Sequence, residues 1–470
     1  MSARLSFLFA LLAAASCRDR SRSEHETPSD RARAEFTGAY PDTVKPNGVV
    51  RDVEIVAAPT ELPLVDGKNL HVWAYNGQVP GPVLRVRLGE TLRVRFTNNL
   101  PQETTIHWHG VRLPNAMDGV PGVTQPPVPP GGEFIYEFTP KDAGTFWFHP
   151  HVRSSEQVER GLYGVLVVDD ATPPPYSQDL VWVLDDWRLD ASGQIDPNFN
   201  TRHDLAMDGR WGGAITINGR TDTVLRARPG ERIRLRLLNS ANGRVFAPDF
   251  GALDAQAIAV DGLYLPSPVP ASGFELAPGN RLDVELVFDR SSSAPLEIWD
   301  RFIARRPNRL ATVEIDGDLV DTPRFVSPAR AHVPAWSNAT EIPAAHTFLL
   351  DAQSGGDLGI QWPIDGVAFA GHDHAMAPAL TLERDRFYHL RFSNTSPRIH
   401  PIHLHGMFFR LLARNGAPSG ETWFRDTVLI HPREQIDIGL VPTDPGTWMM
   451  HCHILEHAEA GMMTTIAVTP

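Results

Sequence analysis

The sequence predicts an all-β protein built from three consecutive sandwich or barrel domains. Short polar–apolar alternations, as in Thr91–Phe96, Glu133–Phe138 and Gly144–Phe148, are typical of strands with one buried face. Gly (37 residues) and Pro (41 residues) are abundant, as in a chain that turns often between short strands. The 470 residues allow three domains at roughly 150 residues each, and no long amphipathic helical pattern is present.

A similar segment recurs at three positions along the chain. Arg87–Asn98, Arg228–Asn239 and Leu382–Asn394 each combine a turn, an alternating strand and a closing Asn. The recurrence predicts three related units, with boundaries near the triple proline at 173–175 and between Asp321 and Pro343. The predicted domains are therefore 44–172, 173–325 and 340–470.

The amino terminus has the pattern of an export signal. Arg4 supplies a positive start, Leu5–Ala15 a short apolar stretch, and Ala13–Ala15 a small-residue cleavage region, so residues 1–17 are the predicted signal peptide. The apolar stretch is too short to span a membrane. The run Ala14-Ala15-Ser16-Cys17 also resembles a bacterial lipoprotein signal, and both a lipid anchor on Cys17 and plain cleavage stay open. Either route predicts a periplasmic or cell-envelope protein.

Composition and charge narrow the partners. Residues 18–43 are rich in charge, Ser, Pro and Thr, which predicts a disordered tether. The formal net charge of −13 argues against nucleic acid as a partner. No feature points to an obligate oligomer, and a monomer is expected.

The most informative stretch is His451-Cys452-His453, which His457 and Met462 follow. Cys452 has no cysteine partner in the body of the protein, which favours metal ligation over a disulfide. Two His, one Cys and a weak axial Met form the blue-copper electron-transfer pattern. On an extended strand, His451 and His453 share one face and Cys452 points to the other, so one strand can serve two metal sites.

Histidines gather in three further clusters that also contain His-x-His pairs. Together the four clusters hold ten of the 19 histidines, whereas the middle unit contains only His203. Because two clusters belong to the first unit and two to the third, we expect a shared metal site where these units meet. The clusters are His107 and His109; His149 and His151; His400, His403 and His405; and His451, His453 and His457.

In this order the clusters resemble the four copper-binding motifs of the multicopper oxidases, and the layout resembles bacterial laccases and periplasmic cuprous oxidases of that family. The resemblance covers essentially the whole chain after the tether. It implies three cupredoxin-like Greek-key domains, of which the middle one has no copper ligands. It also implies four coppers per chain: one type 1, one type 2 and two type 3.

The resemblance carries ligand roles over to this chain residue by residue. It implies type 1 copper at His400, Cys452 and His457, with Met462 axial; type 2 copper at His107 and His403; and the type 3 pair at His109, His149, His151, His405, His451 and His453.

Two acids are candidates for delivering protons. Asp118 matches the family's acid near the type 2 copper, while its alternative role is a turn residue before Gly119. Many bacterial relatives carry an acid directly after the second type 1 histidine, and here that position is Ala458. Glu459 is the candidate substitute. Asp426 is expected to have a structural role.

The family implies one-electron oxidation of a small reducing substrate coupled to the four-electron reduction of O2 to water. Electrons are expected to enter at the edge of His457. The leading hypothesis is laccase-type oxidation of phenols and aromatic amines. Oxidation of Cu(I) or Fe(II) in copper tolerance is the alternative, with His372, His374 and Met376 as either metal donors or an exposed loop.

Two further classes stay open. The first is a copper-sequestering protein without turnover. The second is copper nitrite reductase, which normally holds its type 1 ligands in the first domain, whereas Cys452 lies in the third.

Overall fold

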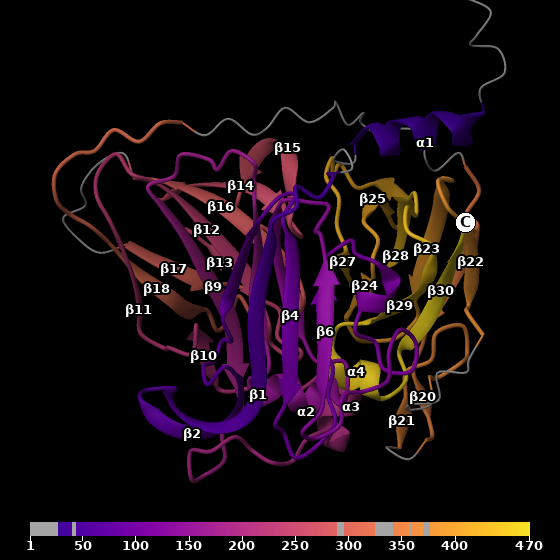
Figure 1. The fold of residues 1–470 in the computed structure, drawn as a ribbon, viewed down its shortest axis with the longest axis horizontal. Coiled ribbons are helices and arrows are strands. Elements are labelled where there is room, and N and C mark those ends of the chain that lie inside the picture. Colours follow the sequence, from indigo (N-terminus) through magenta and orange to yellow (C-terminus); the bar gives the residue numbers. More distant parts are fainter. Residues whose placement is uncertain (1–26, 40–43, 289–295, 325–341, 357–358, 370–376) are drawn as a thin grey trace, which may run out of the picture.

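The computed structural model describes residues 27–39, 44–288, 296–324, 342–356, 359–369 and 377–470. In these residues the chain forms three successive β-sandwiches, which we call the first, middle and third sandwich (Figure 1). The predicted all-β fold is confirmed. The export signal with Cys17, and the cluster His372, His374 and Met376, lie outside the described residues.

The first sandwich pairs two four-stranded sheets, ordered β2-β1-β4-β6 and β3-β8-β7-β5. A short 3₁₀ turn, Asn115–Met117, precedes β6, and helix α2 (Ser154–Glu159) follows β7. The strands are β1 (Val50–Leu64), β2 (Lys68–Tyr75), β3 (Val83–Arg87), β4 (Thr91–Asn98), β5 (His107–His109), β6 (Glu133–Phe138), β7 (Gly144–His149) and β8 (Gly164–Asp169).

The middle sandwich pairs a six-stranded sheet, β10-β9-β12-β16-β14-β15, with a four-stranded sheet, β11-β18-β17-β13. Helix α3 (Arg202–Ala206) lies between β9 and β10 in the chain. The strands are β9 (Gln178–Trp187), β10 (Ala214–Ile217), β11 (Thr223–Ala227), β12 (Arg232–Asn239), β13 (Pro248–Asp249), β14 (Asp254–Val260), β15 (Leu263–Pro270), β16 (Arg281–Val287), β17 (Leu296–Asp300) and β18 (Asn308–Ile315).

The third sandwich pairs two five-stranded sheets, β19-β23-β28-β25-β26 and β22-β30-β29-β24-β27, beside the small pair β20-β21. Helix α4 (Leu455–Glu459) joins β29 to β30. The strands are β19 (His346–Leu350), β20 (Gln353–Ser354), β21 (Ile360–Gln361), β22 (Leu380–Glu383), β23 (Tyr388–Asn394), β24 (His400–Leu404), β25 (Phe409–Arg414), β26 (Ala417–Pro418), β27 (Thr427–Ile430), β28 (Gln435–Leu440), β29 (Gly446–Cys452) and β30 (Met463–Thr469).

The repeated sequence segment has the same place in each sandwich. Its strand is β4, β12 or β23, and each pairs in parallel with the first strand of its sandwich, β1, β9 or β19. Each also pairs antiparallel with a later strand, β6, β16 or β28. The repeat therefore marks equivalent strands, and the alternating pattern of β4 places Leu92, Val94 and Phe96 in the core.

The predicted disordered tether over 18–43 is wrong for residues 28–39, which form helix α1 (Pro28–Ala39) on the third sandwich (Figure 1). Ala32 and Phe36 are four residues apart, so they share one helix face, and both are buried. The Phe36 ring meets Phe387 edge-on at 5.2 Å and Phe424 at 5.4 Å between centroids. Two buried apolar side chains thus hold α1 against the third sandwich, although the polar composition of the segment disfavours a folded helix.

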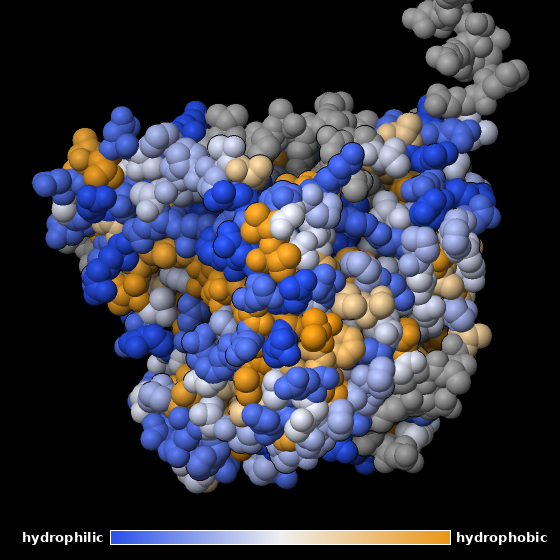
Figure 2. All heavy atoms as spheres, viewed as in Figure 1, coloured by the Kyte–Doolittle hydropathy of each residue, from blue (hydrophilic) through white to orange (hydrophobic). Residues whose placement is uncertain are grey.

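The described part of the chain contains no helix long and apolar enough to cross a membrane. The face drawn in Figure 2 is largely hydrophilic, with apolar atoms gathered near its middle, over the sheet that contains β1, β4 and β6. Ile135 on β6 and Val50 on β1 are among the exposed apolar side chains.

Replacing Phe36 by Ala should release α1 from the third sandwich, because losing a buried aromatic ring costs about 3–5 kcal/mol at a core site. We expect faster trypsin cleavage after Arg31 and Arg33 in the folded protein, measured by mass spectrometry. The exposed neighbour Thr37, replaced by Ala, is the control and should leave the rate unchanged. Equal cleavage of both variants would contradict the docking role of Phe36.

Candidate metal centre

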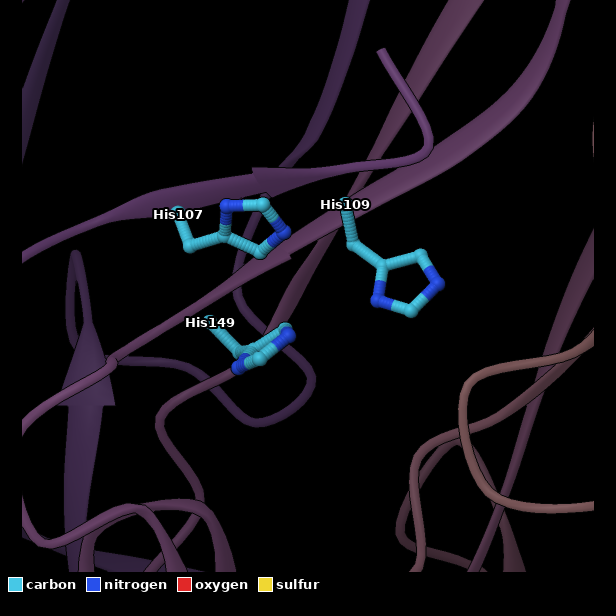
Figure 3. Close-up of side chains that lie close together, drawn as sticks. All are labelled: His107, His109 and His149. Carbon is cyan, nitrogen blue, oxygen red and sulfur yellow. The ribbon is translucent and has the colours of Figure 1, made fainter. Parts of the chain in front are cut away.

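The four histidine clusters meet between the first and third sandwiches, where the His107 ring stacks on His405 and the His109 ring on His403. Within each sandwich, strand pairing brings its two clusters together. In the first, β5 pairs with β7 so that His107 lies opposite His149. In the third, β24 pairs with β29 so that His403 lies opposite His451. Figure 3 shows His107 and His109 on β5 with His149 at the end of β7, their rings directed toward a common space. All the sequence-predicted histidine ligands are brought into two neighbouring groups.

The first group surrounds Cys452, which is fully buried. Its Sγ lies 3.6 Å from Nδ1 of His400 and 3.7 Å from Nδ1 of His457, and the two Nδ1 atoms are 3.1 Å apart. The opposite nitrogens are anchored, since Nε2 of His457 donates to the Met207 carbonyl at 2.7 Å and Nε2 of His400 lies 2.8 Å from Ser396 Oγ. Both rings therefore present Nδ1 to the sulfur.

Met462 lies beside this group through its backbone, while its predicted role as axial ligand stays a prediction. The Cys452 N–H donates to the Met462 carbonyl at 3.0 Å, and the Met462 N–H donates to the His457 carbonyl at 3.0 Å. The Met462 side chain is buried in the same apolar cluster as Cys452.

Burial sets the charge state of the Cys452 group. It raises the pKa of the Cys452 thiol and lowers the pKa of His457 to about 3. The imidazoles are therefore neutral, with lone pairs free to bind, and a bound metal would deprotonate the thiol.

The second group contains the other eight histidines. One set has its ligand nitrogens within 4.8 Å of one another, with His405 Nε2 and His451 Nε2 only 3.1 Å apart. In another set, ring centroids are separated by 5.0 to 5.8 Å. The remaining two lie between these sets, with centroids 5.9 Å apart. The sets are His151, His405 and His451; His109, His149 and His453; and His107 with His403. The ligand nitrogen of His107 also lies within 4.8 Å of those of His109 and His149, and of those of His403 and His405.

Several buried ring nitrogens in the second group have no hydrogen-bond partner within the described residues. An unpaired buried donor or acceptor is costly, so such atoms need an explanation. Imidazole is a good copper ligand, and a metal ion in the shared space would satisfy them together. The residues thus fit copper. The unpartnered atoms are Nε2 of His107, His149, His151 and His403, Nδ1 of His109, and both ring nitrogens of His453.

The far nitrogens of four rings are held by backbone carbonyls. Each such bond fixes the ring's tautomer and aims its other nitrogen into the site. The bonds run from Nδ1 of His107 to Asp118 O (2.7 Å), His149 to Pro150 O (3.0 Å), His403 to Asp426 O (2.9 Å) and His451 to Cys452 O (2.9 Å).

Asp118 lies where two histidine sets meet. Its Oδ2 accepts from Nδ1 of His405 at 2.8 Å, while its backbone carbonyl accepts from His107. Gly119 makes this placement feasible, since a Cβ there would lie 1.8 Å from the Ile106 carbonyl oxygen. Asp118 is therefore in direct contact with the site, not merely a residue of an exposed turn.

Asp426 also touches the second group, which the sequence did not indicate. Its Oδ1 lies 3.2 Å from Nε2 of His109. Burial opposes its ionisation, but the charge of Arg281 and a hydrogen bond from His403 outweigh that effect and lower the Asp426 pKa to about 2. Asp426 lies one residue before Thr427 of β27, which pairs with His403, and no local pattern in the sequence indicates this contact.

Glu459 lies outside the metal-binding sets but lines a cavity that reaches them. The cavity, of about 80 Å³, has room for a few water molecules. Ala458 also lines this cavity. The other lining residues are Val120, Pro121, His149, His151, Arg153, Ser154, Met449, His451, Leu455 and Met463.

Comparison with known proteins agrees with this geometry. Multicopper oxidase family models match residues 57–173 and 341–470, which together are more than half of the chain. The multicopper oxidase MmcO of Mycobacterium tuberculosis is 32% identical over 432 residues, covering 83% of this chain and 82% of that protein. The chain belongs to the multicopper oxidase family.

Solved structures extend the match to the whole fold. A multicopper oxidase from Pseudomonas parafulva has a TM-score of 0.79 at 36% identity, covering 89% of this chain and all of that one. A laccase from Pediococcus acidilactici has a TM-score of 0.77 at 29% identity, covering 92% of each chain. This multicopper oxidase therefore has the cupredoxin-domain fold, binds copper, and is an oxidoreductase that uses O2 and a reducing substrate.

Replacing Cys452 by Ser should abolish the intense blue colour of the copper-loaded protein, because that colour requires a Cu(II)–thiolate bond. Copper at the histidine sets should remain, measured by metal content and electron paramagnetic resonance. Wild-type protein loaded with copper in parallel is the reference and should show the blue band. A blue band that survives in the Cys452 variant would refute the placement of the thiolate site.

Proposed function

We propose that this multicopper oxidase is a laccase-type enzyme that removes single electrons from phenols or aromatic amines and reduces O2 to water with four coppers per chain. The proposed roles are type 1 copper at His400, Cys452, His457 and Met462; type 2 copper at His107 and His403; and one type 3 copper each at His109, His149 and His453 and at His151, His405 and His451.

The observation that carries this proposal is the direction of successive side chains at the end of β29. Cys452 faces His400 and His457, while His451 and His453 face the larger histidine group. The covalent path from the sulfur to either histidine is one residue long. Copper bound at the two groups would supply one-electron storage and the reduction of O2.

The surroundings of His457 support an organic substrate. Its Nε2 donates to the carbonyl of Met207, directly after α3, and the Trp362 ring lies 4.3 Å from its ring. Asp208 follows, with its side chain 34% exposed, and burial raises its pKa. A phenol or aromatic amine bound beside Asp208 would find a carboxylate able to take the proton that its oxidation releases.

Oxidation of Cu(I) or Fe(II) is the second candidate. Met207 and Asp208 offer a thioether and a carboxylate next to His457, and soft thioethers favour Cu(I). The Met207 Sδ accepts a hydrogen bond from Arg398 at 2.7 Å, and the Arg398 side chain is 24% exposed. Copper resistance protein A of Pseudomonas syringae is 32% identical over 48% of this chain.

For proton supply we propose two acids. Asp118, bonded to His405, would serve the histidine sets directly. Glu459 would serve them through water in the cavity that His149, His151 and His451 share with it. Many relatives carry their acid at the position of Ala458, and Glu459 places a carboxylate one position later. Export, the lipid anchor at Cys17 and the monomeric state stay predictions.

Replacing Asp208 by Asn should lower kcat/KM for a phenol by about 10-fold or more, because a positioned base is lost. Oxidation of ferrocyanide, which releases no proton, is the internal control and should change little. An equal loss for phenol and ferrocyanide would count against Asp208 as a base.

Replacing Met207 by Leu tests the second candidate function. If Cu(I) is the substrate, this variant should slow Cu(I) oxidation selectively.

Replacing Glu459 by Gln should lower kcat for O2 reduction with every reducing substrate, because proton delivery to the histidine sets is slowed. Anaerobic bleaching of the blue colour by the substrate, measured by stopped flow, should keep its rate. Exposed Glu133 on β6, replaced by Gln, is the control. Unchanged turnover in the Glu459 variant would remove this residue from the proton route.

A further inference from the structure

The middle sandwich holds none of the proposed copper ligands, yet one of its loops forms a wall of the histidine group. The loop runs from Ala277 to Arg281, at the start of β16. Gly279 in this loop packs against two imidazoles: a Cβ there would lie 2.9 Å from Cδ2 of His453 and 3.0 Å from Cε1 of His109. The loop therefore approaches the rings as closely as backbone allows.

The same loop ends in a fully buried arginine that contacts both other sandwiches. Arg281 donates through Nη1 and Nη2 to the two oxygens of Asp426 in the third sandwich, at 2.9 and 2.5 Å. Its Nε donates to the Thr145 carbonyl of the first sandwich at 3.1 Å. Forked pairing of this kind fixes both the position and the plane of the carboxylate.

Arg281 is itself held by a buried acid. The carboxylate of Asp261 accepts the Arg281 backbone N–H at 3.1 Å and lies 3.3 Å from the backbone nitrogens of Asp426 and Thr427. Asn280 completes the connection, donating to Asp261 at 3.0 Å and to the Thr427 carbonyl at 3.0 Å. Side chains of the middle sandwich thus hydrogen-bond to the backbone of the segment that carries Asp426 and hold it in place.

The Asp426 carboxylate, held in this way, contacts His109. Asp426 Oδ1 lies 3.2 Å from Nε2 of His109 and also accepts from Thr427 Oγ1 at 2.8 Å. Nε2 is thereby engaged, and Nδ1, which has no partner among the described residues, is left to face the histidine group. Five of the other seven rings are held through Nδ1 instead. His109 differs from them because Asp426, with Thr427 Oγ1 at 3.3 Å, occupies its Nε2.

Gly110, directly after His109, makes room for the ion pair. A Cβ at Gly110 would lie 2.3 Å from Nη2 of Arg281 and 2.4 Å from Oδ2 of Asp426. Its positive φ of 80° is also a conformation that glycine adopts without strain. The glycine of the His-Trp-His-Gly segment is thus explained by a residue about 170 positions later in the chain.

We propose that Arg281 is a positioning residue of the histidine group: together with Asp261 it holds Asp426 against His109, so that the middle sandwich fixes which nitrogen this ligand offers to copper. This inference rests on the proposed ligand role of His109. A ligand's hydrogen-bond partner of this kind typically contributes about 10- to 100-fold to metal affinity.

The test replaces Arg281 by Met in the full chain and compares copper binding with wild type. We expect copper at the histidine group to bind about 10- to 100-fold more weakly in competition with a chelator. The electron paramagnetic resonance signal of the histidine-bound copper should change, while the blue band of the Cys452 site is retained. Replacing Arg281 by Lys, which keeps the charge but not the fork, should give an intermediate affinity.

A matched control separates positioning from general destabilisation. Arg234 is equally buried in the same sandwich and pairs with Asp283, donating also to Tyr264. Replacing Arg234 by Met should lower the melting temperature but leave the copper affinity and the spectrum unchanged. Replacing Asp261 by Asn loosens the grip on Arg281 without removing a forked pair and should shift the spectrum in the same direction as Arg281→Met.

Two results would overturn the inference. One is an Arg281→Met protein with wild-type chelator competition and spectrum, and the other is an equal loss of copper affinity in the Arg234→Met control. Either result would leave the proposed oxidase function intact, because wild-type activity and copper content test that function separately. A wild-type chain that loads no copper at the histidine group would instead remove the function and the inference together.

Discussion

The strict alternation of side chains along an extended strand is the constraint on which this molecule depends. At the end of β29, consecutive residues belong to different sites, because Cys452 faces His400 and His457 while its neighbours face the larger group. On a helix, residues two apart do not share a face, so His451 and His453 could not both face the larger group. The strand is in turn fixed by pairing with β24 and β30, so that a one-residue slip would exchange the two faces. The fold class is thus a chemical requirement as well as an architectural one.

Burial of so many imidazoles explains why the three sandwiches must fit together closely. Burial, reinforced by the neighbouring rings, lowers the pKa of His109, and the same holds for His149 and His405. Neutral rings avoid mutual repulsion but leave unpaired nitrogens, which cost free energy until a metal binds. Folding and metal binding are therefore linked, since an ion that binds the assembled group stabilises the arrangement that creates it.

The sequence predicted the candidate metal ligands better than the residues that hold those ligands in place. Cys452 and all the histidine ligands except His457, which is in α4, could be placed because each lies on a short strand or within two residues of its end. The alternating pattern of β4 was equally clear. The contacts of Asp426 could not be placed, because they depend on Arg281 and Asp261, which lie far away in sequence. Contacts of this kind leave no local pattern.

The error over residues 28–39 has a similar origin. The composition of this segment is typical of a disordered chain, and over residues 28–37, whose burial the structure describes, Ala32 and Phe36 alone are well buried. Their docking depends on a receptor surface in the third sandwich, Phe387 and Phe424, more than 350 residues away. Local composition reports what a segment can bury against itself, not what a distant surface offers it.

The middle sandwich shows how a domain without ligands can still determine a metal site. It supplies the Met207 carbonyl that orients His457, and the loop with Gly279 and Arg281 that orients His109. These two histidines belong to different groups, so one rigid body sets the orientation of a ligand in each. Ligands held by one rigid body keep their relative positions better than ligands held by separate loops, so the middle sandwich fixes how the two groups lie relative to each other.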